Sequence, residues 1–254
     1  MYTPFRDVLL RLVALITIRC GRYFEEHQMI HSVRELIKDL IISRRISDRF
    51  LASLGSHSRV LDLGCGSGIR SSLLKQIYPN SEIYGVDRIE RERVPHFVIY
   101  KKVDLDVEPL PYPDGFFDAI IFNHVIEHLK QPLQLGSEIN RVLKRDGKIY
   151  VETPNWTTIF VPSFGFKREQ LDSPFNFYDD PTHVKPWSKQ GIFAFLAQNC
   201  DLQIEKVGTV RNWARVPFDP LEILRACAKG ERRHVVGSVW NLYGWCIYGI
   251  ARKA

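Results

Sequence analysis

One stretch decides the fold: Val60-Leu61-Asp62-Leu63-Gly64-Cys65-Gly66-Ser67-Gly68. Its first residues are mostly apolar, which is typical of a buried strand. The strand runs into a glycine-rich turn, and residues 69–78 continue with the spacing of a helix. Gly64 and Gly66 let the backbone bend tightly and let a ligand approach where a Cβ would clash. We therefore expect a ligand to bind at this turn.

The spacing of the glycines argues against a dinucleotide ligand. A dinucleotide fingerprint places glycines at relative positions 1, 3 and 6, the last for close packing between helix and strand. Here the glycines stand at positions 1, 3 and 5, and Ile69 occupies position 6. The carboxylate of Asp62 would also repel a pyrophosphate, whereas it suits a ligand that carries an ammonium or a sulfonium.

The rest of the chain alternates strands with helices. Apolar, β-rich runs predict strands over residues 59–63, 82–86, 97–103, 117–122, 148–152 and 202–210. Helical spacing and capping residues predict helices over residues 3–20, 28–53, 69–78, 132–143 and 188–198. This alternation indicates βαβ units in a mostly parallel α/β sheet that is covered on both faces.

Six motifs, in order along the chain, resemble those of the class I S-adenosylmethionine-dependent methyltransferases of the small-molecule type. They are Asp62-Leu63-Gly64-Cys65-Gly66-Ser67-Gly68, Tyr84-Gly85-Val86-Asp87, Asp104-Leu105, Leu110-Pro111-Tyr112-Pro113-Asp114-Gly115-Phe116-Phe117-Asp118, Asn123-His124-Val125-Ile126-Glu127-His128-Leu129 and Arg141-Val142-Leu143-Lys144-Arg145-Asp146-Gly147. The resemblance covers roughly residues 58–155. It implies a Rossmann-like methyltransferase fold with a mostly parallel seven-stranded sheet, helices on both faces, and helical extensions at both ends.

The same resemblance implies that S-adenosylmethionine is the cofactor. Asp87 would accept both ribose hydroxyls, and Asp104 with Leu105 would recognise adenine. Asp106 is a rival for the adenine role, because the register of the third strand is open. The expected cofactor-binding residues are Asp62, Gly64, Cys65, Gly66, Gly68, Asp87, Arg88, Asp104, Leu105 and Asn123.

Methyl transfer requires the acceptor atom, the methyl carbon and the sulfur to be held in line. A hydroxyl acceptor must also lose a proton, so a base within hydrogen-bond reach helps. His183, in Asp179-Asp180-Pro181-Thr182-His183, is the first candidate, and His124 is the second. We expect Glu127 and His128 to build the loop and the start of a helix, and we expect no metal site.

Residues 154–187 carry eight aromatic side chains and predict a lid over an apolar or ring-bearing acceptor. We expect a helical cap over residues 1–55, the cofactor-binding domain with this lid over 56–213, and an apolar, basic-flanked helical tail over 214–254. Residues 235–251 of the tail hold no charged residue. They predict either a helix docked on the domain or at a dimer interface, or one that lies on a membrane surface.

The net charge of +6, from 35 Lys and Arg against 29 Asp and Glu, is concentrated in that tail. Residues 225–254 contain six basic residues against Glu231 alone, or 6 − 1 = +5. The charge therefore favours an anionic membrane surface over a nucleic acid, which would call for a dense basic stripe with stacking aromatics. Five widely spaced cysteines without a CxxC pair favour a reducing, cytoplasmic compartment. The basic, aromatic tail adds the expectation of peripheral contact at the inner face of the membrane.

The sequence thus predicts an S-adenosylmethionine-dependent enzyme that O-methylates a small or lipid-linked acceptor, such as a sugar, a glycolipid or a quinone-type ring. An RNA methyltransferase is the alternative enzyme, and a non-catalytic cofactor-binding partner protein is the alternative of another class. Asn123-His124-Val125-Ile126 stands where an amine-flipping Asn-Pro-Pro-aromatic motif would lie in the RNA enzymes, which argues against the first alternative. The glycines of the loop and Asp87 argue against the second. The oligomeric state is open.

Overall fold

The computed structural model describes residues 46–161, 163, 175–213 and 215–254, without the side chains at 232 and 233. Residues 44–254 form one compact unit. The helices predicted over 3–20 and over most of 28–53 lie outside the described residues. The first described element is α3 (Ile46–Ala52), which lies within the predicted range 28–53.

A seven-stranded sheet in the order β3-β2-β1-β4-β5-β7-β6 forms the centre of the unit. Its strands are β1 (Arg59–Leu63), β2 (Glu82–Asp87), β3 (Ile99–Lys102), β4 (Phe117–Asn123), β5 (Leu143–Pro154), β6 (Gln203–Val210) and β7 (Cys246–Arg252). All neighbours pair in parallel except β7, which runs antiparallel to both β5 and β6. The predicted mostly parallel, seven-stranded α/β sheet is confirmed.

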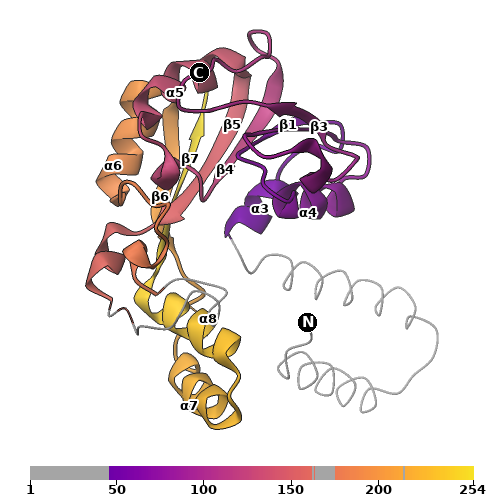
Figure 1. Ribbon diagram of the computed structural model, residues 1–254. Coiled ribbons are helices and arrows are strands. Elements are labelled where there is room, and N and C mark those ends of the chain that lie inside the picture. The colour runs from indigo at the N-terminus through magenta and orange to yellow at the C-terminus, as the bar shows by residue number, and fades with distance from the viewer. Residues whose placement is uncertain (1–45, 162, 164–174, 214) are drawn as a thin grey trace, which may run out of the picture. The chain divides into compact units, whose positions relative to one another are not determined.

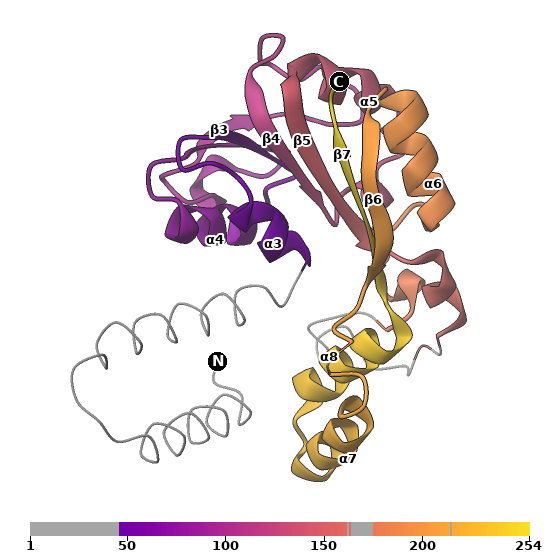
Figure 2. The same cartoon turned by 180° about the vertical axis from the view of Figure 1, so that it is seen from behind.

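Helices cover both faces of the sheet (Figures 1 and 2). They are α4 (Ile69–Ile77), α5 (Pro132–Val142) and α6 (Lys189–Ala194), together with α3; α6 continues as a π-helical turn, Phe195–Asn199. Ser188 caps α6, as predicted, by accepting a hydrogen bond from the amide of Gly191 at 3.0 Å. Single-turn 3₁₀ helices span Arg91–Arg93, Ile126–His128, Trp156–Phe160 and Phe177–Asp179.

Two hydrophobic cores follow from the alternation of side chains along the strands. In β4, Ile120 and Phe122 point into the core that holds α5 and α6, whereas Ala119 and Ile121 point into the core that holds α3 and α4. Burial of one large side chain such as Phe122 contributes ~1.5–3 kcal/mol. The sheet is therefore stabilised from both sides.

The prediction of an apolar helix over residues 235–251 is wrong for its second half. Helix α8 (Arg232–Tyr243) ends at Gly244, which has a φ of 69°, and Cys246–Arg252 is the strand β7. A strand buried between two others shows no polar alternation, so its sequence cannot be told from a buried helix by periodicity. Because β7 lies inside the sheet, its side chains are not free to meet a membrane surface.

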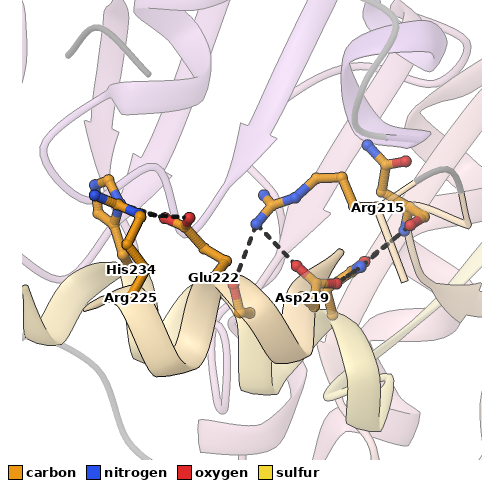
Figure 3. A network of polar contacts seen from close by, with 8 residues as sticks. Arg215, Asp219, Glu222, Arg225 and His234 are labelled. Atoms are coloured by element: carbon orange, nitrogen blue, oxygen red, sulfur yellow. Dashed lines mark hydrogen bonds and ion pairs between the residues drawn. The ribbon is translucent and has the colours of Figure 1, made fainter. Parts of the chain in front are cut away.

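The helices α7 (Asp219–Lys229) and α8 pack against each other beyond the ends of β6 and β7 (Figure 1). A polar network joins them, as Figure 3 shows. Buried Asp219 accepts from Arg215 at 3.0 Å and from Asn241, while Arg225 bonds Glu222 at 2.7 Å. Among the described residues, no helix combines the length and the apolar character that a membrane span requires.

Candidate active site

The carboxyl ends of the parallel strands lie at one edge of the sheet, which is where ligands bind in sheets of this kind. Strand β1 ends there in the glycine loop, β2 ends in Asp87 and β4 ends in Asn123. The antiparallel strand β7 starts at the same edge, where Cys246 pairs with Pro154 of β5. His124 directly follows β4, Asp104 and Leu105 follow β3, and His183 lies in the segment before α6.

The three glycines of the loop all have positive φ, but they differ in their surroundings. A Cβ on Gly64 would lie 2.3 Å from Val125, and one on Gly68 would lie 2.5 Å from Pro95. A Cβ on Gly66 would meet no atom of the described residues within 4 Å. Gly64 and Gly68 are therefore required by packing, whereas Gly66 offers its backbone to open space, as the loop of a ligand site must.

Asp87 ties the second strand to the loop. One carboxylate oxygen accepts from the amide of Gly66 at 2.9 Å, and the other accepts from the amide of Arg88 at 2.7 Å. The second oxygen also accepts from the amide of Ile89 at the longer distance of 3.3 Å. The carboxylate therefore has one unused lone pair and one weakly used one for hydroxyl donors. The hydroxyl of Tyr100 donates to the carbonyl oxygen of Asp87 at 2.6 Å and fixes the strand end.

Of the two candidates for the adenine role, Asp106 is already committed to the fold. Its carboxylate accepts from the amides of Lys130 and Gln131 at 2.7 and 3.0 Å, just before α5. The exposed carboxylate of Asp104 accepts from the amide of Asp106 at 3.0 Å. Asp104 is thus the better placed of the two to meet a ligand, while Leu105 packs into the core.

Two other predicted cofactor residues lie beneath the loop. Asp62 is buried and accepts from the hydroxyl of Ser71 in α4 at 2.7 Å. The thiol of Cys65 packs in the core that holds α3 and α4, where burial raises its pKa to about 12. Both residues therefore shape the loop from below, and Cys65 can offer a ligand only its backbone.

Burial raises the pKa of Asp62 to about 6, against the hydrogen bond from Ser71 and the charge of Arg70, which lower it. A carboxyl whose pKa is raised on folding stabilises the protein fully below its unfolded pKa, and that contribution is lost as the pH rises through the folded value. Asp62→Asn, which does not titrate, should therefore gain up to ~3 kcal/mol in free energy of unfolding relative to the parent chain between pH 4 and 7.

Urea denaturation of both chains at several pH values measures this difference. Asp114→Asn is the matched control, because that carboxylate is exposed, and its stability difference should not vary in the same way. A difference between Asp62→Asn and the parent that stays constant from pH 4 to 7 would contradict the effect ascribed to burial.

At the end of β4, Asn123 and His124 differ in whether their polar side-chain atoms have partners. The side-chain oxygen of Asn123 is buried and has no hydrogen-bond partner among the described residues. His124 has a φ of 56°, and both its ring nitrogens are engaged: Nδ1 lies 3.3 Å from Glu127 and Nε2 lies 3.4 Å from Glu152. Asn123 thus has an acceptor to offer, whereas His124 has no free nitrogen with which to take a proton.

The charged groups around His124 also argue against a role as a base. Burial alone would lower its pKa, but Cys246, Glu127 and Glu152 hold that pKa well above its ordinary value. Tyr150 donates a hydrogen bond to Glu152, which completes a buried polar group. This group links β4, β5 and β7 at the edge of the sheet and is better suited to hold the loop than to accept a proton.

His183 also lies close to Glu127, with a ring nitrogen within 4.8 Å of a carboxylate oxygen. Its Nδ1 lies 2.6 Å from the carbonyl oxygen of Phe177, and its ring packs on those of Phe177 and His128 with centroids 4.5 and 4.8 Å away. The amides of Val184 and Lys185 donate to the carbonyl oxygen of Glu127 at 2.8 and 3.2 Å. These two bonds bring the segment of His183 to the end of β4.

The aromatic segment is only partly described. Phe175, Phe177 and Trp187 are buried, whereas Trp156, Phe160 and Tyr178 are exposed. Phe164 and Phe166 lie outside the described residues. The exposed rings agree with a surface that can receive an apolar ligand, and the buried ones form part of the packing, so the lid stays a prediction.

Three residues near the predicted site residues were not themselves predicted from the sequence. Ser71 bonds Asp62, and its signal is its place three residues before Leu74, on a face of α4 that is otherwise apolar. Thr153 donates to Glu127 at 2.9 Å and follows the predicted fifth strand directly. Cys246 carried no signal, because its segment was expected to be helical.

The pattern of the methyltransferase domain family matches residues 27–205. A probable S-adenosylmethionine-dependent methyltransferase of Mycolicibacterium smegmatis is 34% identical over 129 residues, which are 50% of this chain and 45% of the relative. A malonyl-[acyl-carrier protein] O-methyltransferase of Legionella pneumophila is 30% identical, over 44% of this chain and 42% of the relative. A ubiquinone/menaquinone biosynthesis C-methyltransferase of Cupriavidus taiwanensis is 24% identical, over 70% and 74%.

The chain spans about a third to a half of the length of the first of the curated relatives it matches. Among solved structures, an S-adenosylmethionine-dependent methyltransferase from Mesorhizobium loti has a TM-score of 0.57 at 16% identity and covers 82% of this chain and 97% of that one. A phosphoethanolamine N-methyltransferase of Haemonchus contortus, solved in complex with S-adenosyl-L-methionine, has a TM-score of 0.53 at 17% identity, over 85% and 52%. These likenesses show the Rossmann-like fold.

Proposed function

The chain belongs to the class I S-adenosylmethionine-dependent methyltransferases, and on that premise we propose that it transfers a methyl group to an oxygen of a small or lipid-linked acceptor. The observation that carries the proposal is the convergence of three features at one edge of the sheet. They are the open backbone of Gly66, the carboxylate of Asp87 and the unpartnered oxygen of Asn123.

These residues fit the cofactor that the family uses. Asp87 can accept the two ribose hydroxyls, Asp104 can accept from the adenine amine, and Gly66 leaves room for the backbone to approach. The buried oxygen of Asn123 needs a donor, and the ammonium of a bound methionine moiety would supply one. When bound, S-adenosylmethionine supplies an electrophilic methyl group on a sulfonium.

His183 lies on the acceptor side of the site in this proposal. Its segment is held to the end of β4 through Glu127, and exposed aromatic rings of the same loop region, Trp156 and Tyr178, suit an apolar or ring-bearing acceptor. A sugar, a glycolipid or a quinone-type ring would meet that description. Two relatives are named for acceptors within or near this range: one is a ubiquinone/menaquinone biosynthesis C-methyltransferase and the other is a malonyl-[acyl-carrier protein] O-methyltransferase.

Any contact with a membrane is proposed for a surface other than the one predicted from the sequence. Strand β7 is buried, whereas Phe218, Leu221 and Leu224 at α7 are 61–68% exposed. These side chains recur with helical spacing. If the acceptor carries a lipid, this exposed face of α7 is the part of the described chain best suited to meet it.

Replacement of His183 with alanine tests the acceptor side. We expect turnover to fall at least about 100-fold while S-adenosylmethionine binding stays unchanged, because His183 lies on the acceptor side of the proposed site and not among the cofactor residues. The assay incubates tritium-methyl S-adenosylmethionine with aqueous and lipid extracts of the source cells, and isothermal titration calorimetry measures binding.

His96→Ala is the matched control, since His96 is an exposed histidine of the same unit. Transfer of label by the parent chain but not by His183→Ala supports the proposal. Full turnover by His183→Ala would remove His183 from the reaction, and a parent chain that binds no S-adenosylmethionine would overturn the methyltransferase activity itself.

A further inference from the structure

Glu127, His128 and His183 form a cluster that the sequence did not predict. A carboxylate oxygen of Glu127 and one ring nitrogen of each histidine all lie within 4.8 Å of one another. Glu127 is fully buried, and the two histidines are half-buried. The cluster joins the segment after β4, which carries Glu127 and His128, to the loop that carries His183. It therefore borders the place where we propose that the methyl group is transferred.

The hydrogen bonds fix which nitrogen of each histidine is free. Nδ1 of His183 faces a carbonyl oxygen of Phe177, which can only accept, so Nδ1 carries the proton. Nδ1 of His128 lies 3.2 Å from the carbonyl oxygen of Thr182 and 3.0 Å from its hydroxyl. That hydroxyl already donates to Asp180 at 2.6 Å, so it can only accept from His128. With Nδ1 as the donor, the lone pair of each ring in its neutral form is on Nε2.

This is the arrangement that supports metal-ligating side chains. A ligating histidine normally donates its other ring N–H to a carbonyl oxygen or a carboxylate, which fixes the ring and raises its basicity. Both histidines do so here. Glu127 is held in turn at one oxygen by the hydroxyl of Thr153 at 2.9 Å and at the other by Nδ1 of His124 at 3.3 Å, so each oxygen keeps one lone pair for a cation. Two backbone bonds from Val184 and Lys185 to Glu127 keep the two halves of the cluster together.

Two other clusters of the described residues lack these properties. In His124, Glu152 and Cys246, both nitrogens of the only histidine already face carboxylates, and the carboxylate and the thiol are buried. In Glu222, Glu231 and His234, the guanidinium of Arg225 lies 2.7 Å from both carboxylates and holds the place of a cation (Figure 3).

We propose that Glu127, His128 and His183 bind a divalent transition-metal cation that contacts the methyl acceptor. Two imidazole nitrogens with one carboxylate favour Zn²⁺, Mn²⁺, Fe²⁺ or Co²⁺, whereas Mg²⁺ and Ca²⁺ prefer ligands that are all oxygen. Three protein ligands leave coordination positions open for a substrate. A hydroxyl-bearing acceptor, such as a diol or an ortho-oxygenated ring, suits those positions.

The chemistry of this role rests on the proposed function. A cation lowers the pKa of a hydroxyl that it contacts, so the acceptor can lose its proton to water without a protein base. The acceptor oxygen then forms a bond to the methyl carbon, and the bond from carbon to sulfur breaks with its electron pair on sulfur. The products are the methylated acceptor, S-adenosylhomocysteine and one proton. His183 serves in this step by holding the cation.

Titration of the full, chelator-treated chain with Co²⁺ tests the site without any acceptor. We expect one equivalent to bind and to give a visible ligand-field absorption, because Co²⁺ reports nitrogen and oxygen ligands directly. His128→Ala and His183→Ala should each weaken Co²⁺ binding at least about tenfold. Both histidines are half-buried, so these variants are expected to fold, and circular dichroism checks that they do.

His234→Ala is the matched control and should leave Co²⁺ binding unchanged, because Arg225 occupies its cluster. Absence of stoichiometric binding, or binding that survives both His128→Ala and His183→Ala, would overturn the proposal. Calorimetry with S-adenosylmethionine on the same samples separates this failure from that of the proposed function. If the chain binds S-adenosylmethionine but no Co²⁺, the proposed methyltransferase function stands and only the proposed cation site is refuted.

Discussion

Asp87→Ala is expected to weaken S-adenosylmethionine binding by more than about 100-fold, the largest effect on binding that the site predicts. The carboxylate would accept two ribose hydroxyls, and a hydrogen bond to a charged group is worth ~1.5–3 kcal/mol. The same carboxylate accepts from the amide of Gly66 at 2.9 Å, so its loss also loosens the loop. Calorimetry of the variant against the parent chain measures the change.

Two controls make this result specific. Asp104→Ala removes one proposed contact to adenine and should cost about tenfold. Asp114→Ala should have no effect on binding, because Asp114 is exposed and pairs with Arg141 away from the strand ends. An Asp87→Ala chain that folds and binds S-adenosylmethionine as the parent does would refute the ribose assignment.

Gly64→Ala is expected to lower the free energy of unfolding by about 2–5 kcal/mol, the largest effect on stability. The φ of 69° costs a non-glycine residue ~1–2 kcal/mol, and overpacking costs a further ~1–3 kcal/mol. The new Cβ would lie 2.3 and 2.8 Å from the two methyl groups of Val125, so one change of rotamer cannot relieve both contacts. Urea denaturation measures the loss.

Gly66→Ala is the matched comparison within the same loop. The φ of Gly66 is 49°, but a Cβ there would meet no atom within 4 Å in the part of the chain that the structure describes. The free energy of unfolding of this variant should therefore fall by only about 1–2 kcal/mol. Its affinity for S-adenosylmethionine should fall instead, because the Cβ points into the space proposed for the ligand. Equal stability losses in the two variants, with Gly66→Ala binding normally, would contradict this division of roles.

The order of strands and helices could be predicted wherever the sequence carries local signals. The loop from Gly64 to Gly68, the cap at Ser188 and the helix over 69–78 are where the residues indicated them. Strand β7 could not be found, because burial on both faces removes the polar alternation that marks a strand. The same apolar run therefore fitted a helix equally well.

The proposed cofactor residues could be selected from the sequence because most of them lie at the ends of strands. Asp87 and Asn123 are the last residues of β2 and β4, and the glycine loop follows β1. The acceptor side was harder, since Glu127, His128 and His183 meet only through the fold. The sequence places 54 residues between the two histidines, and nothing local relates them. His128 was expected to be structural, yet its hydrogen bonds to Thr182 leave its Nε2 free.

The central claim is that the methyl group is presented to the cluster of Glu127, His128 and His183. A crystal structure of the full chain with S-adenosylhomocysteine tests this most directly. We predict the ribose hydroxyls on Asp87, the adenine beside Asp104, and the sulfur turned toward the edge that carries His128 and His183. A sulfur that faces away from these histidines, or a ligand bound elsewhere than at the glycine loop, would contradict the account.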